Sequence, residues 1–233
     1  DESPVCEADE NSEAFILAAL GRDFPDIPAV SEEAVSVGRI PAVGQSFFLV
    51  DPLDGTKEFL AKNGEFTVNI ALVSEGAPVL GVIGIPVTGE IYAAVKGAGA
   101  LRIEGESVAS IRNTRSTKSL VAAVSRSHAS DAGDGWLEQQ GVSDRIRCGS
   151  AIKFCRVAEG AADLYVRFGR TMEWDTAAGH CILEESGCRL IVAETGEALS
   201  YGKPGFDNPS FIACRADLSF GLGQGHQAKA GNL

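Results

Sequence analysis

Residues 51–56, Asp-Pro-Leu-Asp-Gly-Thr, combine two carboxylates with a glycine and a hydroxyl group. An apolar run, Phe47–Val50, precedes them and predicts a short buried strand, and the helix that follows is predicted over Thr56–Lys62. Carboxylate oxygens are the ligands that hard divalent cations such as Mg²⁺ prefer. The N–H groups of Gly55 and Thr56, at the start of a helix, favour an anion. The segment therefore predicts a site for a metal ion together with a phosphate.

Other kinds of site share letters with this segment. The aspartyl-phosphate hydrolases need D-x-D-G-T, and here Asp51 and Asp54 are separated by two residues instead of one. An EF-hand needs D-x-D-x-D-G and a later glutamate, and the sequence lacks that pattern. An Asx-turn followed by a helix cap, with no catalytic role, also fits. The segment alone leaves this last alternative open.

Three further carboxylates occupy positions that resemble helix starts. Glu32 lies in Ser31-Glu32-Glu33, Asp9 follows Glu7-Ala8, and Asp175 lies at the start of the helix predicted over 174–186. Each one alone is compatible with an ordinary cap that the helix dipole stabilises. The residues by themselves do not decide between caps and metal ligands.

The elements around these residues change in character along the chain. A helix is predicted over 11–20, with an apolar stripe of Ala14, Phe15, Leu17 and Ala18. An antiparallel meander is predicted from strands at 67–73, 79–87, 90–95 and 100–103. Beyond a polar boundary at 113–119, strands are predicted at 121–125, 163–167, 189–192 and 211–214, and helices at 135–140, 151–159 and 174–186. This alternation indicates an α/β arrangement.

Charge and composition narrow the class of function. The 233 residues carry 20 basic and 32 acidic side chains, a net charge of −12, which disfavours binding to nucleic acid or to an anionic bilayer. No apolar stretch approaches the ~20 residues that span a membrane, and the acidic segment Asp1–Glu13 is unlike a signal peptide. The six cysteines form no C-x-x-C pair, so we expect reduced, buried thiols in a cytoplasmic protein.

With these motifs, the chain resembles the lithium-sensitive, Mg²⁺-dependent phosphatases related to inositol monophosphatase. It is most similar to their branch of bacterial 3′(2′),5′-bisphosphate nucleotidases, the CysQ type. The run D-P-L-D-G-T-K-E-F-L, followed by N-G-E-F-T-V-N-I-A-L, is typical of that branch. Inositol monophosphatases usually have D-P-I-D-G-T-x-N-F there. The other similar segments are 3–9, 31–33, 125–128, 149–160 and 174–180, so the resemblance covers most of the chain as far as about Phe211.

The resemblance implies a fold and a division of the chain. The fold is a layered α-β-α-β-α sandwich, of the α/β (α+β) class. We expect an N-terminal α+β half at 1–114 with most of the metal ligands, and an α/β half at 115–220 that completes the site. The Gly-rich residues 221–233 are predicted to be a disordered tail. The family carries a helical segment ahead of the match to Ser3–Asp9, and commonly a threonine where this chain has Cys6.

The resemblance also implies the metal ligands and the catalytic pair. Glu32, Asp51 and the carbonyl oxygen of Leu53 are expected to hold one Mg²⁺. Asp51, Asp54 and Asp175 are expected to hold a second ion, and the resemblance leaves a third, weaker ion near Glu32 open. A metal pair of this kind clamps the attacking and leaving oxygens of an in-line displacement.

Thr56, hydrogen-bonded to Asp9, is expected to orient and deprotonate the attacking water. A threonine hydroxyl alone is a poor base, so a carboxylate behind it is needed.

Substrate contacts follow from the same resemblance. His128 is expected against the adenine, and Ser150, Lys153 and Arg167 against the second phosphate and the ribose. The rest of the expected substrate-binding set is Glu32, Leu53, Asp54, Gly55, Thr56 and Asp175. Lys and Arg both suit phosphate, but plain structural roles for His128, Lys153 and Arg167 stay open. The S-x-x-K pattern at Ser150–Lys153 lacks the S-D-N and K-T-G partners of penicillin-binding enzymes.

His180 lies five positions beyond Asp175 on the same predicted helix, about 140° around its axis. We therefore expect a packed histidine rather than a metal ligand.

The implied activity is Mg²⁺-dependent hydrolysis of the 3′-phosphate of adenosine 3′,5′-bisphosphate to AMP and phosphate, with 3′-phosphoadenylyl sulfate as a second substrate. Such an enzyme clears a by-product of sulfate assimilation. Two alternatives remain: an inositol monophosphatase or related sugar phosphatase, and a nucleotide-binding sensor without activity. We expect a small-molecule substrate, a monomer or homodimer, and a cytoplasmic location, with peripheral association with the inner membrane left open.

Overall fold

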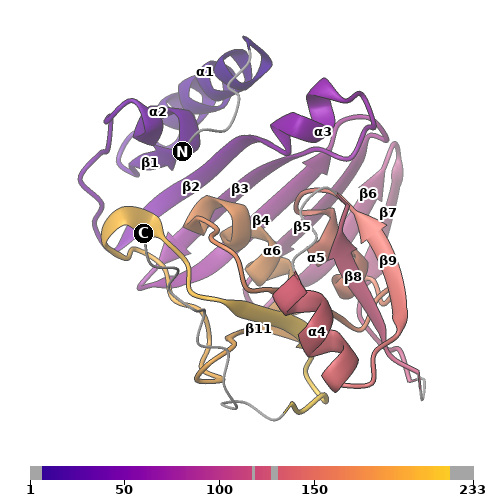
Figure 1. Ribbon diagram of the computed structural model, residues 1–233. Helices are drawn as coiled ribbons and strands as arrows, with labels where there is room; N and C mark the ends of the chain where they lie inside the picture. Colours follow the sequence, from indigo (N-terminus) through magenta and orange to yellow (C-terminus); the bar gives the residue numbers. More distant parts are fainter. Residues whose placement is uncertain (1–6, 117–118, 127–130, 221–233) are drawn as a thin grey trace.

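The computed structural model describes residues 7–116, 119–126 and 131–220. It stacks five layers in the order helix, sheet, helix, sheet, helix (Figure 1). The helices of these layers are α1 (Glu7–Asp23) and α2 (Glu32–Ser36) outside the first sheet, α5 (Ile152–Ala158) and α6 (Glu173–Glu185) between the sheets, and α4 (Asp131–Gln139) outside the second sheet. This is the α-β-α-β-α sandwich that the resemblance implies, so the predicted fold class is confirmed.

The first sheet has seven strands in sequence order and contains the predicted meander. Its strands are β1 (Ala29–Ser31), β2 (Ser46–Asp54), β3 (Thr67–Ser74), β4 (Ala77–Ile85), β5 (Glu90–Val95), β6 (Gly99–Glu104) and β7 (Ser107–Ile111). Strand β1 pairs with β2 in parallel, and the other neighbours are antiparallel. The sequence did not predict β1 or β7, and β2 is longer than predicted because pairing with β3 continues through Asp51 to Asp54.

The second sheet has five strands in the order β11-β12-β10-β8-β9. Its strands are β8 (Val121–Ser125), β9 (Asp144–Cys148), β10 (Leu164–Arg167), β11 (Cys188–Val192) and β12 (Phe211–Arg215). Strand β8 pairs in parallel with β9 and β10, whereas β12 is antiparallel to β10 and β11. Strand β9, which was not predicted, is polar and mostly unburied, so it lacks the apolar run from which the other strands of this sheet were predicted.

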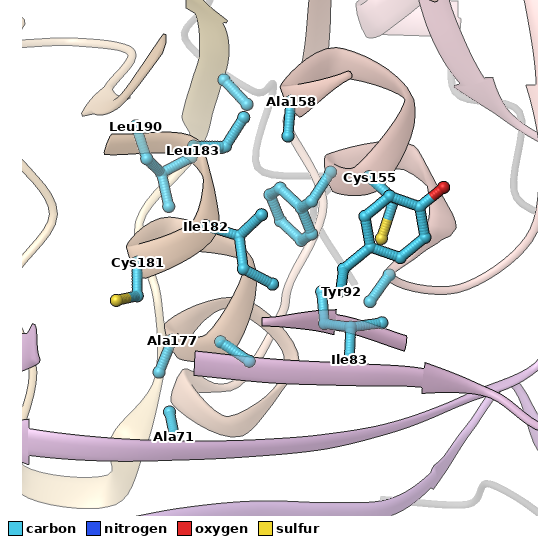
Figure 2. Close-up of a cluster of buried hydrophobic side chains, with 14 of the residues drawn as sticks. Ala71, Ile83, Tyr92, Cys155, Ala158, Ala177, Cys181, Ile182, Leu183 and Leu190 are labelled. Carbon is cyan, nitrogen blue, oxygen red and sulfur yellow. The ribbon is translucent and has the colours of Figure 1, made fainter. Parts of the chain in front are cut away.

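Helices α5 and α6 form the core between the sheets (Figure 2). Ile83 and Tyr92 of the first sheet face Cys155 and Ile182 of these helices, and all four are fully buried. Helix α6 lies so close to β4 that a Cβ on Gly81 would come within 2.4 Å of the helix backbone. This packing fixes the position of α6, which carries a candidate ligand at its start.

Helix α1 corrects one prediction. It starts at Glu7 rather than at residue 11, and Phe15, expected in the apolar stripe, is 77 % exposed. The buried positions are Asp9 and Glu13, one turn apart. Glu13 accepts a hydrogen bond from the backbone N–H of Ala34 at 2.9 Å, so polar contacts, and not hydrophobic periodicity, decide which side faces inward.

The remaining features are the short helices, the thiols, and the predicted residues that lie outside the described part of the chain. Helix α3 (Thr56–Leu60) follows β2, and a 3₁₀ turn spans Pro204–Phe206. The five cysteines in the described part of the chain are buried free thiols, as predicted. In the same part of the chain, no helix has the length and apolarity needed to cross a membrane. Cys6, His128 and the predicted tail at 221–233 lie outside the described residues.

Candidate active site

The end of β2 places the Asp51–Thr56 segment at the edge of the first sheet. The register with β3 shifts between Asp51 and Asp54, which makes room for irregular backbone at this point. One oxygen of Asp51 accepts the N–H of Leu53 at 3.1 Å, so the Asx-turn considered above is present. Gly55 has φ +96°, and a Cβ there would lie 2.1 Å from Ser150 Oγ. Glycine is therefore required for this turn.

Three carboxylates from distant parts of the chain converge on one point. Glu32 is the first residue of α2, Asp51 is on β2, and Asp175 is in the first turn of α6. Each offers an oxygen within 4.8 Å of the others. Asp175 also accepts the N–H of Met172 at 2.7 Å, so it caps its helix as well. The capping and metal-ligand interpretations are compatible for this residue.

Burial and mutual repulsion raise the pKa of each of these carboxylates. The pKa of Glu32 rises to about 8 and that of Asp175 to about 7, with burial as the main cause and the neighbouring carboxylates next. The pKa of Asp51 is raised well above its usual value for the same reasons. Buried like charges are costly without a cation, and a set of oxygen donors suits Mg²⁺. The residues present therefore fit a divalent ion.

Asp54 lies beside this cluster rather than within it. Its carboxylate accepts long hydrogen bonds from Thr67 at 3.4 Å and Asn69 at 3.5 Å. Its charge raises the pKa of Glu32 and of Asp175. Its place as a ligand of a second ion stays a prediction, as does that of the Leu53 carbonyl.

The hydrogen bond expected between Thr56 and Asp9 is present, with 3.3 Å between the two oxygens. Asp9 is 1 % exposed and comes from α1, so an outer helix supplies the carboxylate behind the hydroxyl. Their roles in activating water stay predictions.

A pocket of about 550 Å³ is lined by residues from both halves of the chain. Its acidic lining residues include Glu32, Asp51, Asp54 and Asp175. Its cationic lining residues are Lys57, Arg126, Lys153, Arg167 and Arg170. The volume suits a small organic ligand, and the two kinds of charge suit metal ions and anionic groups in one site.

Lys153 and Arg167 are the two pocket cations that were predicted from the sequence, and Lys153 is buried whereas Arg167 is partly exposed. Lys153 is 5 % exposed, donates to the Ser150 carbonyl at 2.5 Å and lies 5.2 Å from the centre of the Tyr165 ring. Burial lowers its pKa, and Asp54 acts in the opposite direction. Arg167 ends β10, and its Nε is buried with no hydrogen-bond partner in the described part of the chain. Such a donor calls for a ligand.

Ser150 and His180 contact protein groups. The Ser150 hydroxyl lies within hydrogen-bond distance of the carbonyl oxygens of Asp54 and Glu65, so its expected contact with substrate stays a prediction. His180 is 2 % exposed and contacts Tyr201 and Glu184 through its two ring nitrogens. The prediction of a packed histidine is confirmed. His128 lies outside the described residues.

The sequence did not predict three cations of the pocket: Lys57, Arg126 and Arg170. Arg126 lies within the 125–128 segment noted above, and it pairs with Glu65. Arg170 follows Arg167 by three positions and pairs with Asp207 at 2.6 Å. Each partner is far along the chain, so only folding reveals these pairs.

Comparisons with known proteins agree with this geometry. The model of the inositol monophosphatase family matches residues 1–215. The chain belongs to the inositol monophosphatase family. Enzymes of this family use Mg²⁺, in keeping with the carboxylate cluster. The predicted resemblance is thereby confirmed.

Among curated relatives, the chain is 43 % identical to the 3′(2′),5′-bisphosphate nucleotidase CysQ of Salmonella typhimurium over 212 residues, 91 % of this chain and 85 % of the relative. It is 42 % identical to the protein of that name from Escherichia coli K12, with equal coverage. A crystal structure of CysQ from Bacteroides thetaiotaomicron, at 39 % identity, superposes with a TM-score of 0.81 over 92 % of this chain and 86 % of that one. An inositol monophosphatase from Anabaena, at 25 % identity, gives 0.74 over 89 % and 81 %.

Proposed function

We propose that this protein is an Mg²⁺-dependent phosphatase that removes the 3′-phosphate of adenosine 3′,5′-bisphosphate, with 3′-phosphoadenylyl sulfate as a second substrate. The observation that carries the proposal is that one pocket is lined both by the carboxylate cluster and by the cations Lys153 and Arg167. A substrate with two separated phosphate groups can place one at the metal-binding carboxylates and the other at these cations. The names of the nucleotidase relatives support this choice.

The residues that would hold two Mg²⁺ ions are Glu32, Asp51 and the Leu53 carbonyl for one, and Asp51, Asp54 and Asp175 for the other. Bound there, the ions would supply Lewis-acid stabilisation of phosphate oxygens and an acidified water. The raised carboxylate pKa values support this assignment, because burial and mutual repulsion raise them and a bound cation offsets both effects. A third ion near Glu32 belongs to the same proposal.

Thr56 and Asp9 would handle the proton of the attacking water. The Thr56 hydroxyl donates to Asp9, so its oxygen lone pairs are available to accept a proton from water. As the water oxygen bonds to phosphorus, Thr56 takes its proton and passes its own to Asp9. The P–O3′ bond breaks, and the ribose oxygen leaves with a proton from solvent.

Lys153 and Arg167 would hold the second phosphate. An arginine fork and a lysine point charge both bind phosphate well, and the unpartnered Nε of Arg167 supports an anion at this place. The pocket lining around the reacting phosphate would comprise Glu32, Leu53, Asp54, Gly55, Thr56 and Asp175. Ser150 and His128 complete the proposed substrate-binding set.

Phosphate release tests this proposal against the alternatives. We expect rapid release from adenosine 3′,5′-bisphosphate with Mg²⁺, little from inositol 1-phosphate, and none with EDTA. A preference for inositol 1-phosphate would favour a sugar phosphatase, and no release from either substrate would favour a nucleotide-binding sensor.

The setting of the enzyme is part of the proposal. A net charge of −12 supports a small-molecule substrate and no nucleic-acid partner in the cytoplasm. Sedimentation distinguishes a monomer from a homodimer. We also keep the division at residue 114, supported by the two sheets, whose strands lie within 29–111 and 121–215.

A further inference from the structure

Glu65 lies in the connection between α3 and β3, on the first-sheet side of the pocket. Glu65 is not one of the described residues that line the pocket, but three residues that it contacts, Arg126, Gly149 and Ser150, do line it. Its side chain is 23 % exposed. Any influence that it has on a ligand must therefore act through the residues that it holds.

The Glu65 carboxylate binds two segments of the second sheet. Arg126, just after β8, donates from Nε and Nη2 to its two oxygens at 2.6 Å each, a bidentate pair. The N–H of Gly149, just after β9, donates to the same carboxylate at 2.8 Å. Arg126 is the main reason why the pKa of Glu65 is lowered. The carboxylate therefore stays ionised and joins the ends of β8 and β9 to the first half.

The backbone of Glu65 is packed equally closely against the second half. Its carbonyl oxygen lies 2.9 Å from Ser150 Oγ, which is also 2.7 Å from the Asp54 carbonyl. A Cβ on Gly149 would lie 2.5 Å from the Glu65 carbonyl, so only glycine allows this approach. Ser150 itself has φ +49°, an uncommon conformation for a residue with a side chain. These contacts fix the backbone of Gly149 and Ser150.

The Ser150 carbonyl is the acceptor for the buried ammonium of Lys153. The contacts thus form a continuous series from Glu65, through Gly149 and Ser150, to Lys153. Glu32, Asp51 and Asp175 make none of these hydrogen bonds. Asp54 takes part only through its backbone carbonyl oxygen, which accepts from Ser150, and not through its carboxylate.

We propose that Glu65 is a positioning residue that fixes Lys153 at the distance from the metal-binding carboxylates that a second phosphate requires. This inference rests on the proposed function. Glu65 acts on recognition of the second phosphate and leaves the reaction at the first phosphate unchanged.

The test compares two nucleotides that share the reacting 3′-phosphate: adenosine 3′,5′-bisphosphate and adenosine 3′-monophosphate. In Glu65→Gln, the side-chain amide N–H₂ faces the N–H donors of Arg126 or Gly149, so the contact between residue 65 and these two residues weakens. Loss of a charge-assisted hydrogen bond predicts a rise in KM of about tenfold for the bisphosphate. The kcat for the bisphosphate and both constants for the monophosphate are expected to change less than about twofold on the same scale.

A control variant and a second readout separate positioning from general damage. Asp23→Asn breaks another bidentate pair, between Arg22 and Asp23 on the exposed end of α1, and should leave all constants unchanged. Cys148 is 5 % exposed and adjacent to Gly149. Its alkylation by iodoacetamide, followed by peptide mass, should be faster in Glu65→Gln and unchanged in Asp23→Asn.

The outcomes are distinct. A fall in the preference for the bisphosphate, with kcat retained, supports the proposal. Equal losses for both nucleotides, or an unchanged preference, overturn it. If the wild-type protein hydrolyses neither nucleotide, the proposed function fails, and the alkylation of Cys148 then tests the positioning role. Faster alkylation only in Glu65→Gln supports the contact of Glu65 with Arg126 and Gly149, and unchanged alkylation overturns it.

Discussion

Replacement of Lys153 by methionine isolates the charge at the proposed second-phosphate end. Methionine has a similar length and can keep the apolar contact with the Tyr165 ring, where the ammonium now lies 5.2 Å from the ring centre. The variant removes the ammonium, with its hydrogen bond to Ser150, its contact over the Tyr165 ring and its attraction to Asp54. Because Lys153 is 5 % exposed, the charge is little screened by solvent.

The expected loss is confined to substrates with a second phosphate. A hydrogen bond to a charged group contributes about 1.5–3 kcal/mol, which corresponds to a fall of about 10- to 150-fold in kcat/KM for adenosine 3′,5′-bisphosphate. Adenosine 3′-monophosphate should lose less than about threefold on this scale. The free energy of unfolding should not fall by much, since a buried ammonium is costly to desolvate.

Initial rates at saturating Mg²⁺ measure the effect, with Lys203→Met as the matched control. Lys203 also donates to a backbone carbonyl and lies 5.4 Å from a tyrosine ring, but it is outside the pocket. That variant should lose stability, because Lys203 pairs with buried Glu173, and should keep the substrate preference. Equal losses for both nucleotides in Lys153→Met would refute the reasoning.

Other predictions concern the carboxylates and the turn. Asp54→Asn should remove most Mg²⁺-dependent turnover without loss of Tm, measured by phosphate release and calorimetry, and a near wild-type rate would contradict a two-ion site. In EDTA, the contribution of Glu32 and Asp175 to the free energy of unfolding should be largest near pH 4 and should fall as the pH rises toward 8. The reason is that their raised pKa values make the folded state hold protons that the unfolded state releases. Added Mg²⁺ should therefore raise Tm more at pH 8 than at pH 6, and an equal rise at both would count against this linkage. Gly55→Ala should cost at least about 1 kcal/mol in urea unfolding, since φ is positive and a Cβ would meet Ser150 Oγ.

Features that depend on residues close together in the sequence could be predicted. The meander followed from β-rich runs between turn residues, and the Asp51–Thr56 segment indicated a site because its donors are close in sequence. The close spacing of Asp51 and Asp54 makes them neighbours whatever the tertiary fold. The family resemblance then supplied Glu32 and Asp175, which the fold brings within 4.8 Å of Asp51.

Features that depend on long-range packing could not be predicted from local pattern. Phe15 fitted a hydrophobic stripe, but the helix buries the face that carries Asp9 and Glu13, which make polar contacts, and leaves Phe15 exposed. The pair of Glu65 and Arg126 joins residues 61 positions apart, and neither residue type signals a partner. Such pairs become visible only when the two sheets meet.

The central claim is that water attacks the 3′-phosphate of a bisphosphate nucleotide at this pocket. Hydrolysis of adenosine 3′,5′-bisphosphate in ¹⁸O-labelled water, followed by ³¹P NMR, tests it most directly. The account predicts adenosine 5′-monophosphate without label, and inorganic phosphate that carries the label. Release of adenosine 3′-monophosphate, or label in the nucleotide instead of the phosphate, would contradict it.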